Sequence, residues 1–77
     1  MNDKRKQEYQ MIGLNIAYYR KLKGCTQMQL AECIGISRTH MSNIEAPNMH
    51  TSISLETLLD IADALEIPAA NLLYFNR

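Results

Sequence analysis

The chain has 77 residues, of which 47% are hydrophobic and 21% charged, with eight basic and eight acidic side chains. This length supports one modest core, so we expect a single domain over residues 1–77, with residues 1–7 as a frayed N-terminal extension. The composition excludes disordered and fibrous classes, and no apolar run approaches the roughly 18 residues that a membrane span needs. Two cysteines are too few for a disulfide scaffold and fit a reducing cytoplasm.

The balanced total charge conceals an asymmetry between the two halves of the chain. Residues 1–38 carry seven basic and three acidic side chains, whereas residues 39–77 carry one basic and five acidic side chains. A polyanionic partner is therefore compatible with the sequence, because the field at one face matters more than the sum. Binding to nucleic acid through bulk charge alone is not expected.

Hydrophobic periodicity predicts five helices and no strands, which places the chain in the all-α class. The first helix carries its apolar stripe at Ile12, Ile16 and Tyr19 and ends at Gly24, the residue type that commonly stops a helix. Thr26 and Gln29 match a capping box and open a second helix. Its apolar positions are Leu30, Ala31 and Ile34, and Gly35 ends it after about two turns.

The second half of the chain supplies three further helices. Ser37 is a good N-cap for a third helix from Arg38 to about Glu45, and Ser54 caps a fourth. Pro68 suits the first turn of a short fifth helix that ends near Tyr74. The core positions expected on these helices are Met41, Ile44, Leu55, Leu58, Ile61, Ala62, Leu65 and Leu72.

Two short helices joined by Gly35-Ile36-Ser37 form a predicted helix-turn-helix. On the third helix, the side opposite Met41 carries Thr39, Ser42 and Asn43, with Arg38 at the N-terminal end. Short amides, hydroxyls and one Arg are the groups that recognise base edges in the DNA major groove. The turn before this helix favours DNA binding over an ordinary solvated face.

The same residues resemble the lambda-repressor-like helix-turn-helix family, the group of phage repressors, Cro proteins and xenobiotic-response-element regulators. The resemblance rests on Thr26-Gln27-x-x-Leu30-Ala31-x-x-Ile34-Gly35-Ile36-Ser37-Arg38-x-x-Met41-Ser42-x-Ile44-Glu45 and continues through Leu72. It implies a compact bundle of five short helices whose third helix lies in the major groove of double-stranded DNA. It also implies a dimer on a near-palindromic operator.

By position, the resemblance assigns a role to each residue of the predicted site. Arg38, Thr39 and Asn43 correspond to base-reading positions, whereas Gln27, Ser37, His40 and Ser42 correspond to contacts with phosphates or flanking bases. Arg20 and Glu45 match a structural ion pair of the family. The family's glycine turn after this Glu is replaced by Ala46-Pro47, and the loop from Asn48 to Ser52 contains neither Lys nor Arg.

Two apolar groups exceed what the predicted core needs. One is a second stripe on the first helix, formed by Met11, Leu14, Tyr18 and Leu22; the other is the C-terminal Leu73, Tyr74 and Phe75. Exposed apolar patches mark interfaces, so the C-terminal residues are candidates for a homodimer interface. The alternative is that the two groups pack on each other within one chain.

The sequence therefore predicts a sequence-specific transcriptional regulator, most simply a dimeric repressor in the cytoplasm. The second hypothesis is an antitoxin-like or anti-regulator module that binds another protein. We expect no enzymatic activity, no metal and no cofactor, because Cys25, Cys33, His40 and His50 match no zinc spacing and no catalytic motif stands out.

Overall fold

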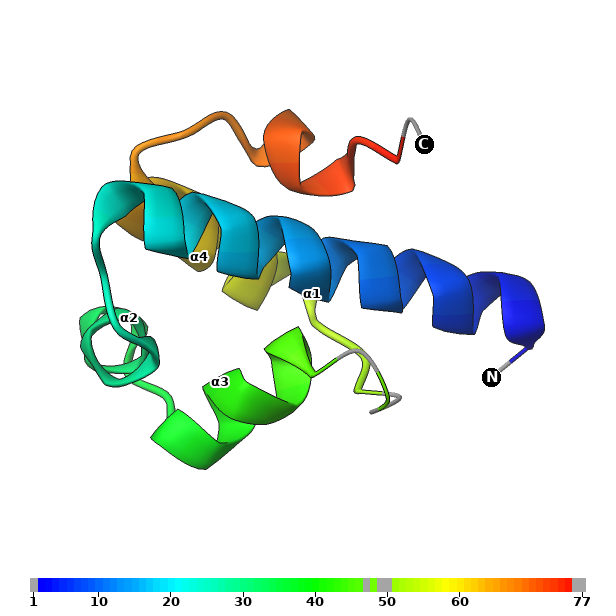
Figure 1. Cartoon of the computed structure of the whole chain (residues 1–77), viewed down its shortest axis with the longest axis horizontal. Coiled ribbons are helices and arrows are strands. Elements are labelled where there is room, and N and C mark those ends of the chain that lie inside the picture. Colours follow the sequence, from blue (N-terminus) through cyan, green and yellow to red (C-terminus); the bar gives the residue numbers. More distant parts are fainter. Residues whose placement is uncertain (1, 47, 49–50, 76–77) are drawn as a thin grey trace.

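The computed structural model describes residues 2–46, 48 and 51–75. Its elements are α1 (Asp3–Lys23), α2 (Gln27–Ile34), α3 (Arg38–Glu45), α4 (Leu55–Leu65) and a 3-10 helix, η1 (Ala69–Leu73). Figure 1 shows α1 crossing the molecule, with α2 and α3 on one side, η1 on the other and α4 behind it. Five helical elements in an all-α fold were predicted, and this class is confirmed.

Helix α1 is longer than the sequence predicted, because residues 3–7 are helical rather than a separate extension. The Asn2 side chain caps the helix by accepting a hydrogen bond of 2.8 Å from the backbone N–H of Arg5. Arg5 and Glu8 form an ion pair one turn apart, and Lys6 lies 3.9 Å from Asp3. Such local capping and charge pairs stabilise a helix end that has no tertiary cover.

The predicted helix boundaries at the two glycines are present. Gly24 and Gly35 adopt left-handed backbone with φ of 77° and 76°, which closes α1 and α2. Thr26 and Gln29 form both bonds of the expected capping box, and Ser37 caps α3 by accepting from the N–H of His40. The two short helices therefore meet in the corner that the sequence predicted.

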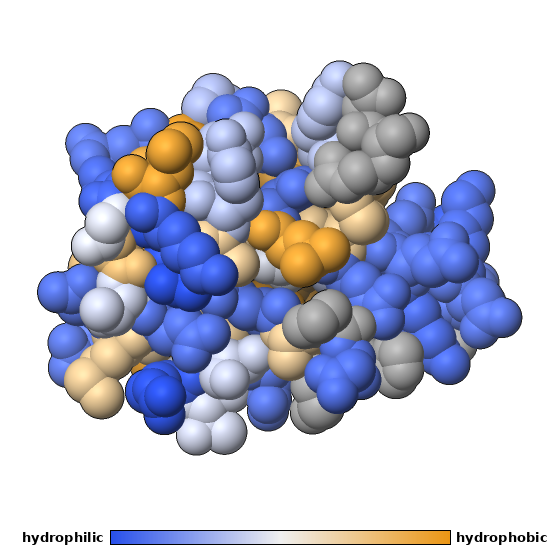
Figure 2. All heavy atoms as spheres, in the orientation of Figure 1, coloured by the Kyte–Doolittle hydropathy of each residue, from blue (hydrophilic) through white to orange (hydrophobic). Residues whose placement is uncertain are grey.

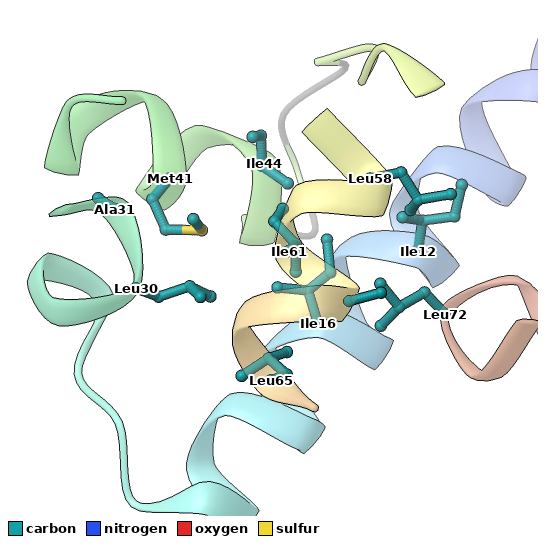
Figure 3. Packing of buried hydrophobic residues seen from close by; sticks show 11 residues of the cluster. Ile12, Ile16, Leu30, Ala31, Met41, Ile44, Leu58, Ile61, Leu65 and Leu72 are labelled. Carbon is teal, nitrogen blue, oxygen red and sulfur yellow. The ribbon is translucent and has the colours of Figure 1, made fainter. Parts of the chain in front are cut away.

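The core takes a nearly or fully buried side chain from each element. Ile16 of α1, Leu30 of α2, Met41 of α3, Ile61 of α4 and Leu72 of η1 are each at most 1% exposed. Figure 3 shows these side chains converging between the helices. Burial of each contributes about 1.5–3 kcal/mol, so every element of the described chain is held by the same cluster.

One predicted core position is wrong. Leu55 is 68% exposed, although periodicity placed it with the other apolar residues of α4. It is the first residue of that helix and lies at the edge of the apolar stripe, whose buried members are Leu58, Ile61, Ala62 and Leu65. A position that periodicity assigns to a core is buried only if another element covers it.

The two surplus apolar groups are covered only in part. Phe75 is half-buried and packs against the core cluster, whereas Leu73 and Tyr74 remain exposed. On α1, Leu14, Tyr18 and Leu22 are 43%, 61% and 69% exposed. Figure 2 shows separate hydrophobic patches on the face toward the viewer, with hydrophilic atoms between them.

Asn15 holds the C-terminal segment against α1. Its buried amide donates hydrogen bonds to the backbone carbonyls of Leu72 at 3.1 Å and Tyr74 at 3.0 Å. These bonds satisfy carbonyls at the end of η1, a short helix whose N-cap residue makes no side-chain cap bond.

Within the described part of the chain, no helix is both long and apolar enough to cross a membrane.

Candidate nucleic-acid interface

The outward side of α3 carries the residues that the sequence assigned to DNA. Arg38, Thr39 and His40 are exposed, and Ser42 and Asn43 are half-buried on the flanks of the same helix. Met41, Ile44 and Glu45 are buried on the opposite side. The helix therefore separates a face that packs from a face that offers short hydrogen-bonding groups and one guanidinium.

Two backbones set how closely α3 approaches α1. A Cβ built on Gly13 would lie 2.3 Å from the carbonyl oxygen of Ile44 and 3.3 Å from the Cα of Glu45. Only a residue without a side chain fits there, because real Cβ atoms do not approach an oxygen so closely. This contact could not be predicted from local sequence patterns, because it joins residues that are 31 positions apart.

A buried ion pair ties α1 to the end of α3. Arg20 and Glu45 are 8% and 6% exposed, and the guanidinium donates from Nε to Oε2 at 2.7 Å and from Nη2 to Oε1 at 2.9 Å. Arg20 Nη1 also donates to the carbonyl of Cys25 at 2.8 Å. The hydrogen bonds with Glu45 hold the pKa of Arg20 above its ordinary value. The described residues contain no buried polar side-chain atom without a partner.

Gln27 extends this ion pair to α2. Its side-chain Nε2 donates to Oε1 of Glu45 at 2.9 Å, a contact that the sequence did not reveal. The carboxylate of Glu45, on α3, therefore accepts hydrogen bonds from Arg20 of α1 and from Gln27 of α2. This arrangement fixes the three helices of the predicted DNA-binding unit relative to one another. It also orients the Gln27 side chain, which the resemblance assigns to phosphate contact.

The remaining predicted residues are placed as follows. Ser37 is exposed at the start of α3, where its hydroxyl is engaged in the cap. Asn48 and Ser52 of the connection between α3 and α4 are exposed, while Pro47, Met49 and His50 lie outside the described residues. Cys25 is half-buried against the core, and Cys33 is exposed. Among the described residues, no three potential metal ligands cluster.

Comparison with known proteins places this geometry in a family. The helix-turn-helix family model matches residues 16–72, which include α2, α3, their turn and all of α4. The chain therefore belongs to this helix-turn-helix family, and the lambda-repressor-like resemblance is confirmed.

Curated relatives agree with the family assignment. The chain is 36% identical over 63 residues to the HTH-type transcriptional regulator SinR of Bacillus subtilis (strain 168), covering 82% of this chain and 56% of SinR. It is 31% identical over 64 residues to the control protein C.SmaI of Serratia marcescens, covering 83% of this chain and 74% of that protein. The chain thus spans little more than half the length of SinR.

Solved structures share the same fold. The structure of SinR in complex with DNA aligns with a TM-score of 0.74 at 35% identity, over 82% of this chain and 98% of that chain. The hypothetical transcription factor NHTF from Neisseria aligns with a TM-score of 0.80 at 28% identity, over 91% of this chain and 78% of that chain.

Proposed function

We propose that this chain is a sequence-specific DNA-binding transcriptional regulator that inserts the outward side of α3 into the major groove. The observation that carries the proposal is the division of α3 into a packed face and a polar face. The polar face is uncharged except for Arg38. SinR, a similar protein whose structure was solved in complex with DNA, supports the same use of the fold.

In this proposal, three residues of α3 read bases. Arg38 pairs with guanine, Asn43 pairs with adenine, and the methyl group of Thr39 contacts thymine. Contacts to phosphates or flanking bases come from Gln27, Ser37, His40 and Ser42. Phosphate contacts fix the register of the protein on the duplex and carry no sequence information.

The proposal includes a homodimer that acts as a repressor in the cytoplasm on a near-palindromic operator. One recognition helix contacts too few bases to stand out from the excess of non-specific sites. Two helices about 34 Å apart, one turn of B-DNA, read twice as many. Leu73, Tyr74 and Phe75 are the proposed interface, and the exposure of Leu73 and Tyr74 supports it.

Selection of bound sequences from random duplex DNA by the purified chain tests this function. We expect recovery of a near-palindrome, and no enrichment over the starting pool would refute sequence-specific binding. The Asn43→Ala and Arg38→Ala variants should each weaken binding to the selected site by about 1–3 kcal/mol and relax one base position. Gln27→Ala should weaken all sequences about equally.

A second function follows from the exposed stripe on α1. Leu14, Tyr18 and Leu22 together form an apolar strip that the described chain does not cover, and this favours a module that binds another protein. The selection separates the two functions, because a pure interaction module recovers no preferred sequence. We rank DNA binding first, since the polar face of α3 has no use in that alternative.

A further inference from the structure

A groove of about 380 Å³ lies between the N-terminal half of α1 and the start of α4. The C-terminal segment contributes to its walls. The apolar lining consists of Tyr9, Ile12, Ile53, Leu55, Leu58, Leu73 and Phe75, with Arg5, Glu8 and Ser54 as its polar members. The groove belongs to neither the DNA-facing side of α3 nor the exposed stripe of α1.

The groove and the leucines at its rim are both apolar. Leu55 is 68% exposed and Leu73 is 46% exposed, and both line the groove without filling it. Leu59 lies one turn after Leu55 on α4 and is 45% exposed. A surface that carries both an apolar hollow and protruding leucines can pair with a copy of itself around a twofold axis, since such an interface uses one patch twice.

The charges in the groove also favour a second copy of this chain as its occupant. Its charged lining residues are one cation and one anion, Arg5 and Glu8, which pair with each other within α1. Around a twofold axis, Arg5 of one copy can approach Glu8 of the other, and the reverse holds at the symmetric position. A partner with a uniformly acidic or basic surface would meet a like charge at one of the two.

We infer that a second copy of this chain docks in this groove around a twofold axis, with Leu55 of each copy entering the groove of the other. The inference rests on the proposed dimeric regulator and gives its interface. It moves the centre of that interface from the C-terminal residues alone to the junction of α1, α4 and the C-terminal segment. In this dimer the second copy covers Leu55. Periodicity predicts that Leu55 is buried, and a single chain leaves it exposed.

Sedimentation equilibrium of the full chain at tens of micromolar, without DNA, tests the docking. We expect wild type near twice the 8.8 kDa chain mass, and Leu55→Glu to raise the dimer dissociation constant by about 30-fold or more. Folding is preserved, because an acidic residue in the first turn of a helix is favourable. Leu22→Glu is the matched control, since Leu22 is 69% exposed outside the groove; it should sediment like wild type.

A charge-exchange experiment separates contact between copies from the ion pair within α1. The Arg5→Glu chain and the Glu8→Arg chain should each be mainly monomeric, because like charges meet across the axis. An equimolar mixture of the two should regain the dimer mass, since each copy then faces the opposite charge. A role only within one chain predicts no regain, because mixing leaves each chain's own residues unchanged.

Three outcomes would overturn the docking: a monomeric wild type, a Leu55→Glu chain that dimerises like wild type, or a mixture that stays monomeric. If Leu22→Glu were monomeric and Leu55→Glu still dimeric, the dimer interface would instead lie on the apolar stripe of α1. Binding of the protein to the duplex recovered by the selection is measured in a separate titration. A monomeric wild type that still binds this duplex specifically would refute the docking of a second copy in the groove but not the proposed function. A dimer that selects no sequence would refute the proposed function but not the docking.

Discussion

Replacing Glu45 with Gln removes the charge that balances Arg20 while leaving the size of the side chain unchanged. Both charged residues are more than nine-tenths buried. The carboxylate accepts three hydrogen bonds of 2.7 to 2.9 Å, two from Arg20 and one from Gln27. An amide keeps one acceptor oxygen and turns an NH₂ group toward one of these donors.

The expected loss of stability follows from this geometry. Removing one partner of a buried pair costs about 3–5 kcal/mol, because the other charge is left uncompensated. The carbonyl of Cys25 still accepts from Arg20, and the amide keeps one acceptor, so we expect the lower end, about 3 kcal/mol. For a domain of this size that corresponds to a fall in Tm of roughly 12–24 °C.

Urea unfolding followed by circular dichroism at pH 7 measures this loss. Glu66→Gln is the matched control, because the Lys23–Glu66 pair is exposed and its removal should leave the midpoint almost unchanged. Adding Arg20→Met to Glu45→Gln should recover part of the lost stability, since no buried charge then remains unpaired. A Glu45→Gln chain within about 0.5 kcal/mol of wild type would refute the reasoning.

Further substitutions test other contacts. Gly13→Ala should destabilise the fold by about 1–2 kcal/mol in urea unfolding, because overpacking against the carbonyl of Ile44 outweighs the gain in helix propensity. The control Ala17→Gly, on the same helix, should lose stability through propensity alone. Asn15→Ala should cost about 1–3 kcal/mol by removing the hydrogen bonds to the carbonyls of Leu72 and Tyr74, of which the Leu72 bond is buried. Hydrogen exchange should then rise in η1 first; equal protection in the variant would contradict a clamping role.

Local signals explain why much of the fold could be predicted from the sequence. Thr26, Ser37 and Ser54 each accept a bond from the backbone N–H three residues later, and each begins a helix where the sequence places it. Gly24 and Gly35 end helices for an equally local reason, the left-handed backbone. Signals of this kind depend only on neighbouring residues, so they need no knowledge of the tertiary structure.

The features that could not be predicted depend on residues distant in the chain. Asn15 bonds to carbonyls 57 and 59 positions away, and Gln27 bonds to a carboxylate 18 positions away. Leu55 is 68% exposed, because burial requires cover by another element, which the local pattern of α4 does not reveal. The Asn2 cap at the start of α1 is, in contrast, a local contact with the backbone N–H three residues later.

The backbone contact at Gly13 also bears on how the proposed regulator can acquire new DNA targets. The main chain of α3 at Ile44 contacts α1 at Gly13. The position of α3 against α1 therefore does not depend on which side chains occupy the outer face of α3. If α3 reads DNA as proposed, substitutions at Arg38 or Thr39, which are exposed, change the recognised sequence while the helix keeps its position. Binding preference can diverge between related chains, or be redesigned, one base pair at a time on an unchanged scaffold.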